Sequence, residues 1–285
     1  MAEWKKLGVI AGGGELPLAI AESARRAGKP YFVTRLAGYA DPALDAHPGE
    51  TFDLGAFAGR VAAFKAAGCD AVVIAGQVAR PDLSKLKLDE GALAFMQTLK
   101  SAAGKGDDPL LRALVQFHEA AGFTVLGAEE AAPDLAARAG AYGAIAPSER
   151  DLADIKRAAA VVTAMGAFDI GQAAVVANGL VLGVEAQEGT DGLLRRIAEL
   201  PLAVRGDADN RRGVLLKRPK PAQERRIDLP VIGMKTLEGA SAAGLAGVAV
   251  EAGGALVMNR PALVAEADRL GMFIYGFTRA EVGET

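Results

Sequence analysis

Residues 7–17 read LGVIAGGGELP: an apolar run, three consecutive glycines and then a proline. The run Leu7–Ala11 predicts a buried strand. A helix should follow as far as about Arg26, since Pro17 suits the first turn of a helix. A strand, a glycine loop and a helix in this order can bind a phosphate group at the helix N-terminus. The plain alternative is a tight turn that needs only the conformational freedom of glycine.

The alternation of strands and helices continues through the first 127 residues. Further strands are expected at Tyr31–Arg35, Ala71–Ala75 and Phe123–Leu126, and further helices at Phe57–Ala67 and Leu110–Ala121. This pattern predicts a Rossmann-like parallel sheet with helices on both faces.

A second α/β region follows. Its helices are expected at 151–165 and 191–200 and after Asn259, which we expect to cap its helix; its strands are expected at 173–176, 180–185, 248–251, 256–258 and 273–275. We therefore predict a first domain over 1–127, a linker over 128–150 and a second domain over 151–285. Ligands often bind where two domains meet, so we expect the ligand there.

Composition excludes several classes of protein. The 285 residues carry a net charge of −3, so no overall basic excess would attract a nucleic acid. One cysteine rules out a disulfide framework, and two histidines are too few for a common zinc site. Cys69 and His118 are expected to be ordinary core or satisfied residues. Neither a signal peptide nor a membrane-spanning run is visible, which predicts a cytoplasmic protein.

The glycine loop is an imperfect match to known nucleotide motifs. Gly12 and Gly14 fit a dinucleotide fingerprint, but Pro17 stands at its third glycine. The second strand ends with Thr34 and Arg35 instead of an acidic residue, which disfavours NAD and leaves an NADP-dependent reductase as an alternative. The sequence at Gly104 does not match a P-loop either, because Gly106 follows Lys105 where a P-loop has serine or threonine.

Acidic residues gather at two predicted helix starts. In GVEAQEGTDGLLRR (183–196), Glu188 and Asp191 are three residues apart and could face one cation, as Mg²⁺ requires oxygen ligands. Thr190 or Asp191 is also expected to cap the helix. Asp107 and Asp108 precede a proline-started helix, as capping residues or as ligand contacts.

A basic stretch precedes Asp228. Between Arg205 and Arg226 there are eight basic and three acidic residues, and Pro219 and Pro221 prevent a regular helix. Such an extended strip suits a pyrophosphate, although a solvated loop is the alternative. We expect the basic neighbours to keep Asp228 ionised, as a metal ligand or a water-orienting base must be. Metal-assisted cleavage of a phosphoanhydride fits these residues.

Seven motifs together resemble the UDP-2,3-diacylglucosamine pyrophosphatases of the LpxI type. They are LGVIAGGGELPLAIA, IAGQVARPD, GKGDDPLLR, FDIGQAAVV, GVEAQEGTDGLLRR, GVLLKRPKPAQERRIDLPVIG and AGLAGVAVEAGGALVMNR, which follow the order of the family over nearly the whole chain. The resemblance implies a metal-dependent hydrolase of lipid A synthesis that releases UMP and diacylglucosamine 1-phosphate. It also implies a Rossmann-like N-terminal domain and a distinct α/β C-terminal domain, with the lipid product held between them.

The resemblance also implies site residues. Asp228 is the expected catalytic residue and, with Glu188 and Asp191, the expected ligand of Mg²⁺ or Mn²⁺. The expected substrate-binding residues are Gly13, Gly14, Gln77, Asp107, Asp108, Gln172, Thr190, Lys217 and Gln223. The substrate would be UDP-2,3-diacylglucosamine, with transient peripheral contact at the inner membrane, and alanine-rich helix faces allow a homodimer. A non-catalytic nucleotide or lipid carrier is the other alternative.

Overall fold

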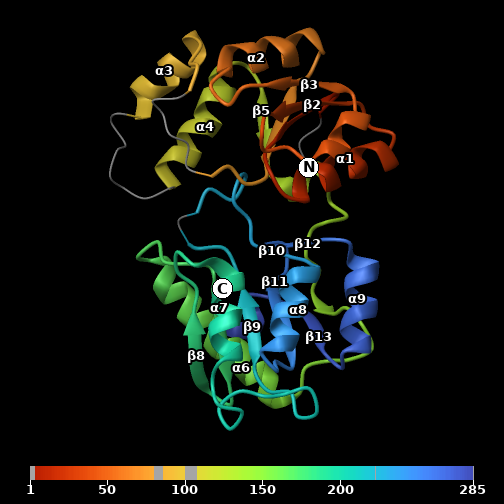
Figure 1. Ribbon diagram of the computed structural model, residues 1–285, viewed down its shortest axis with the longest axis vertical. Helices are drawn as coiled ribbons and strands as arrows, with labels where there is room; N and C mark the ends of the chain where they lie inside the picture. The colour runs from red at the N-terminus through yellow and green to blue at the C-terminus, as the bar shows by residue number, and fades with distance from the viewer. Residues whose placement is uncertain (1–3, 80–85, 100–107, 222, 285) are drawn as a thin grey trace. The chain divides into compact units, whose positions relative to one another are not determined.

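The computed structural model describes residues 4–79, 86–99, 108–221 and 223–284. The chain divides into two compact units (Figure 1). Unit 1 consists of Met1–Asp134 together with Glu224–Ile227, and unit 2 consists of Leu135–Gln223 together with Asp228–Thr285. The predicted class, two α/β domains, is confirmed.

Unit 1 contains a five-stranded parallel sheet in the order β3-β2-β1-β4-β5. Its strands are β1 (Leu7–Ala11), β2 (Tyr31–Leu36), β3 (Gly49–Phe52), β4 (Ala71–Ala75) and β5 (Thr124–Leu126). Its helices are α1 (Leu16–Arg26), α2 (Phe57–Ala66), α3 (Glu90–Leu99), α4 (Asp108–Ala120) and α5 (Ala128–Ala131), with a 3-10 helix η1 (Pro42–Ala46). The predicted strands are present, and the edge strand β3 is an addition.

The core of unit 1 explains the helix positions. Phe64 of α2 and Val115 of α4 pack with Ile10 and Val72 of the sheet in one buried cluster. From β1 the chain adds β2 and β3 on one side of the sheet and then β4 and β5 on the other side. The switch point between β1 and β4 is where open α/β sheets of this kind bind ligands. The glycine loop follows β1 directly, so it lies at this point.

Unit 2 contains a six-stranded mixed sheet in the order β6-β13-β11-β9-β7-β8. Three central strands are parallel, and β6, β7 and β8 run antiparallel to their neighbours. The strands are β6 (Gly140–Ala141), β7 (Ala173–Ala177), β8 (Leu180–Val184), β9 (Val214–Lys217), β11 (Gly247–Glu251) and β13 (Phe273–Phe277). A separate parallel pair joins β10 (Val231–Ile232) and β12 (Leu256–Val257).

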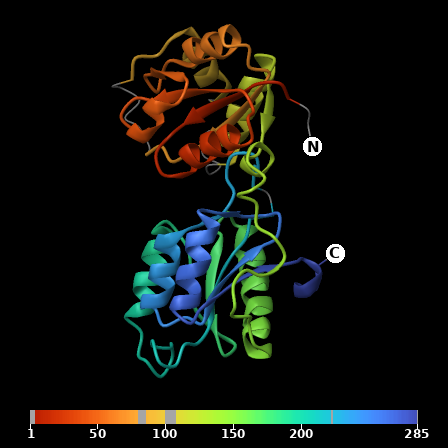
Figure 2. The same cartoon turned by 90° about the vertical axis from the view of Figure 1, so that its right-hand side faces the viewer.

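Helices cover both faces of the unit 2 sheet (Figure 2). Helix α6 (Glu149–Gly166) packs Ile155, Ala158 and Val162 on one face. The other face is covered by α7 (Gly189–Ala198), α8 (Met234–Ala242) and α9 (Arg260–Arg269), which supply Leu193, Leu237 and Leu263 to the larger core. A 3-10 helix, η3 (Ala280–Val282), lies near the C-terminus.

The observed boundary differs from the expected linker over 128–150. Helix α5 packs with unit 1, where Ala128 and Ala131 are buried, and the division falls after Asp134. From Leu135 onward the chain belongs to unit 2, where β6 pairs with β13. Composition suggested a linker because the segment is rich in small residues, but small residues also pack closely against other elements.

The predicted cap of α7 is wrong, and that of α9 is confirmed in position only. Asn259 lies at the expected position but has left-handed backbone angles, and its side chain forms no capping hydrogen bond. Helix α7 begins at Gly189, and Glu188 in the capping position also forms no side-chain cap. The Thr190 hydroxyl is instead used elsewhere, as described below.

Candidate active site

The polar side chains of unit 2 gather at the carboxyl end of its central parallel strands. Lys217 is the last residue of β9 and pairs in register with Ala173 of the antiparallel strand β7. Strand β8 ends beside the beginning of β7, because Val184 pairs with Ala174. Lys217, Gln172 and Glu185 therefore come from three adjacent strand ends. This end of parallel strands is the usual ligand-binding edge of an α/β sheet.

Glu185 connects two of the elements at this edge. It is buried; its Oε2 accepts a hydrogen bond from the backbone N–H of Gln172 at 2.8 Å, and its Oε1 accepts one from the Thr190 hydroxyl at 2.6 Å. Glu185 thus joins the end of β8 to the beginning of β7 and to the first turn of α7. It was not among the expected site residues, although a carboxylate at the end of a predicted strand was the signal that could have found it.

Lys217 brings a buried positive charge to the same edge. Its side chain is only 5% exposed, and Nζ donates a hydrogen bond to the backbone oxygen of Val231 at 3.0 Å. Burial lowers the pKa of Lys217, and the negative charges of Glu185, Asp191 and Asp228 oppose this change. These carboxylates favour the charged form of Lys217, and a charged ammonium group can neutralise a phosphate group.

Gln223 orients Asp228. Its Nε2 donates a hydrogen bond to Oδ2 of Asp228 and another to the backbone oxygen of Asp228, the latter at 2.5 Å. Its Oε1 accepts from the backbone N–H of Lys220 at 2.8 Å, and Nε2 also lies 3.4 Å from Oε1 of Gln172. Gln172, Gln223 and Asp228 are therefore brought together, as the sequence predicted.

Opposing effects act on the pKa of Asp228. Burial raises the pKa of Asp228, while the hydrogen bond from Gln223 and the charges of Lys220 and Lys217 lower it. Burial has the larger effect, so the basic neighbours do not lower the pKa of Asp228 overall, and its ionisation stays a prediction. The raised pKa makes the Asp228 carboxylate a stronger base than an ordinary aspartate.

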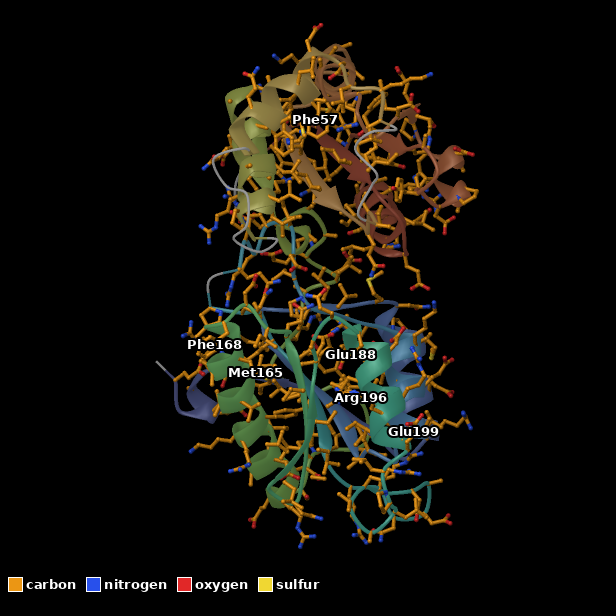
Figure 3. All side chains as sticks on the ribbon, turned by 60° about the vertical axis from the view of Figure 1, so that its left-hand side comes forward. Phe57, Met165, Phe168, Glu188, Arg196 and Glu199 are labelled. Carbon is orange, nitrogen blue, oxygen red and sulfur yellow. The ribbon has the colours of Figure 1, made fainter. Side chains whose placement is uncertain are left out.

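The expected metal set of Asp228, Glu188 and Asp191 is not assembled. Glu188 accepts a hydrogen bond from Nη2 of Arg196 at 2.6 Å, and both side chains lie along the outer surface of α7 (Figure 3). Across residues 4–79, 86–99, 108–221 and 223–284, no three His, Cys, Asp or Glu side chains are grouped to hold a metal ion. Glu188 does not join a metal-binding group because its carboxylate is paired with Arg196, eight residues further along the chain.

The basic stretch does not form one continuous anion-binding strip. Arg205 and Arg211 donate to backbone oxygens of neighbouring loops. Arg218 is buried and forms ion pairs with Glu251 and Glu284 at 2.6 and 2.7 Å. Lys217 and Lys220 are the basic residues of the stretch that act on Asp228.

Unit 1 brings together its own expected residues. Gly13 and Gln77 form a two-way backbone bridge, with N–H to O distances of 2.8 and 2.9 Å. Gly14 has a φ of +86° and open space around it, whereas a Cβ on Gly76 would lie 2.6 Å from the oxygen of Gly13. The loop therefore requires glycine for both conformation and close approach. Asp107 lies outside the described residues, and Asp108 is described only as the first residue of α4.

Arg35, His118 and Cys69 of unit 1 have structural roles. The Arg35 guanidinium donates to the backbone oxygens of Leu44 and Gly49, both at 3.0 Å, so the basic residue needed by the NADP alternative is already engaged. His118 is buried and its Nδ1 lies 2.8 Å from the oxygen of Leu114, which confirms it as a satisfied core histidine. Cys69 is also a buried core residue.

Comparisons with known proteins agree with the two-unit organisation. The family model for the LpxI N-terminal domain matches residues 6–135, and that for the LpxI C-terminal domain matches residues 138–275. A relative, the UDP-2,3-diacylglucosamine pyrophosphatase LpxI of Caulobacter vibrioides (strain ATCC 19089 / CIP 103742 / CB 15), is 48% identical over 272 residues. The alignment covers 95% of this chain and 97% of the relative.

Proposed function

Because the chain belongs to the LpxI family, we propose that it hydrolyses the pyrophosphate bond of UDP-2,3-diacylglucosamine. The products would be UMP and 2,3-diacylglucosamine 1-phosphate. The observation that carries the proposal is the placement of Asp228 beside Gln223 and within the electrostatic influence of Lys217 and Lys220.

The chemistry of a phosphoanhydride suits these groups. Negative charge shifts onto phosphate oxygens as the bond to the leaving phosphate breaks, and preorganised cations stabilise that charge. Lys217 uses one N–H donor on Val231, which leaves the rest of its ammonium group for a phosphate oxygen. Asp228 would orient the attacking water or bind a metal, and its carboxylate must be ionised in either role.

We extend the proposal to Mg²⁺ or Mn²⁺ as the metal. Asp228 and Asp191 both act electrostatically on Lys217, and oxygen donors of this kind suit these ions. Mg²⁺ is commonly bound by one or two carboxylates together with substrate phosphates, which agrees with the lack of a three-residue set among the described side chains. A bound ion would supply further charge neutralisation at the phosphate.

The diacylated substrate also implies a peripheral encounter with the membrane that contains it, on the cytoplasmic side. Among the described segments there is no helix with the length and apolar character to span a bilayer. A homodimer stays a prediction from the alanine-rich helix faces.

Asp228→Asn tests the reaction. We expect release of UMP from UDP-2,3-diacylglucosamine by the wild-type protein with Mg²⁺, a loss with chelator, and a decrease in kcat of about 10²-fold or more in the variant. Asp154→Asn is the matched control, since Asp154 is also buried in unit 2 but caps the β7–β8 turn through Asn178 and Gly179. Full activity of folded Asp228→Asn would reject Asp228 as the catalytic residue, and no turnover by wild type would reject the hydrolase.

A further inference from the structure

An exposed apolar tip follows helix α6. Phe168 is 79% exposed, the highest value among the large hydrophobic side chains described, and Ile170 is 43% exposed. Figure 3 shows Met165 and Phe168 at the end of α6 and Glu188 at the start of α7, all toward the same end of unit 2. Transfer of an aromatic ring from water to an apolar environment is favourable, so contact with an apolar partner would stabilise this position.

The backbone holds this tip in one conformation. The oxygen of Met165 accepts hydrogen bonds from the N–H groups of Phe168 and Ile170 at 2.9 and 3.2 Å. Asp169, between them, has a φ of +58°, an uncommon conformation for a residue with a side chain. Its carboxylate is held by Lys220 Nζ at 2.5 Å. The exposed side chains are therefore presented by an ordered turn.

The tip is continuous with the candidate active site. Gly171 follows it and lies so close to Glu185 that a Cβ would stand 2.1 Å from the oxygen of Glu185. The next residue, Gln172, donates its backbone N–H to the Glu185 carboxylate. On the other side, Lys220 joins the tip to Gln223, which holds Asp228. The tip is thus connected to the residues around Asp228 both through Gly171 and Gln172 and through Lys220.

We propose that Phe168 and Ile170 form the contact for an acyl chain of the bound substrate and favour long-chain substrates over short-chain ones. This inference rests on the proposed function, because the acyl chains are the apolar part of UDP-2,3-diacylglucosamine. A bilayer surface or a second protein would be a different occupant of the same tip, and the experiment distinguishes them.

The test compares kcat/KM for a long-chain diacyl substrate and for its water-soluble diacetyl analogue, both dispersed in detergent. In Phe168→Ser and in Phe168→Ser/Ile170→Ser, the ratio of long-chain to diacetyl kcat/KM should fall about tenfold, because burial of an aromatic side chain is lost. Leu180→Ser is the matched control, since Leu180 is 60% exposed on β8 at the opposite end of the same strand from Glu185. The control should keep the wild-type ratio.

Several outcomes would overturn the inference while leaving the hydrolase intact. An unchanged ratio would reject the acyl contact, and an equal decrease for both substrates would assign the tip a structural role. Loss of binding to phospholipid vesicles with an unchanged ratio would assign the tip to a bilayer surface. If wild type releases UMP from neither substrate, the proposed function fails, and the acyl contact fails with it.

Discussion

Glu185 illustrates how one buried carboxylate can connect several elements of a site. It accepts hydrogen bonds from Gln172 and Thr190 and opposes the effect of burial on the pKa of Lys217. Glu185→Gln retains the size of the side chain but removes the charge. We expect kcat to fall by about tenfold or more, since Lys217 then loses a partner that favours its charged form.

Glu251→Gln provides the comparison for Glu185→Gln. Glu251 is also buried, is the last residue of β11 and forms an ion pair with Arg218. Both variants should lose stability, as measured by urea unfolding, but the decrease in kcat per folded molecule should be confined to Glu185→Gln. Equal decreases in kcat would mean that Glu185 acts only through the stability of the sheet edge.

The residues and the family resemblance together indicated much of this site. The motifs pointed to Asp228, Lys217, Gln172, Gln223 and Thr190, and the structure brings these five together in unit 2. The prediction of Glu188 as a site residue instead of Glu185 was wrong. Spacing along the chain does not show that Glu188 forms an ion pair with Arg196 of helix α7. The pKa of Asp228 could not be predicted either, since burial depends on packing that the sequence does not display.

Within helix α4, His118 makes the stability of unit 1 depend on pH. Burial lowers the pKa of His118 from 6.5 to about 4, Arg60 adds to this effect, and the hydrogen bond to Leu114 opposes it. The neutral ring is favoured in the folded state, so unfolding is accompanied by proton uptake below pH 6.5. The contribution of His118 to the free energy of unfolding should therefore be fully present above that pH. It should decrease by about 3 kcal/mol in total as the pH falls toward 4.

His118→Gln tests this dependence, because glutamine can donate to Leu114 but does not titrate. Urea unfolding can be followed by the fluorescence of Trp4, the single tryptophan, which lies in unit 1. Between pH 7 and pH 4 the wild-type protein should lose about 3 kcal/mol more stability than the variant. Parallel pH profiles would show that protonation of His118 is not linked to unfolding.

Hydrophobic patterns predicted strands and helices better than their ends. The buried strands β1, β4, β7 and β11 were expected close to their observed bounds, since continuous apolar runs identify central strands. The central strand β9 was not expected, although its sequence VLLK is also apolar up to Lys217. The edge strand β3 was missed because GETF has no such run. The predicted cap of α7 was wrong because the Thr190 hydroxyl donates its hydrogen bond to the Glu185 carboxylate. The residues near Thr190 in the sequence do not indicate such a tertiary contact.

For the whole molecule, the division into units could be predicted only in part. The order of strands and helices showed two α/β regions, and the family models match the same two regions. Nothing local marks Glu224–Ile227 as part of unit 1. There Arg226 pairs with Glu119 at 2.8 Å, and Ile227 packs on the cluster containing Phe64 and Val115. Such a return of the chain becomes visible only from long-range packing.

This return predicts that Ile227, the residue before Asp228, stabilises unit 1. Ile227→Ala should lower the stability of unit 1 by about 2 kcal/mol, the lower end for loss of a partly buried isoleucine. Trp4 should report this as a lower urea midpoint. Leu182→Ala is the matched control, since Leu182 packs on the core of unit 2. A shift of the Trp4 transition in Leu182→Ala alone would contradict the assignment of Ile227 to unit 1, and equal shifts would mean that both units unfold together.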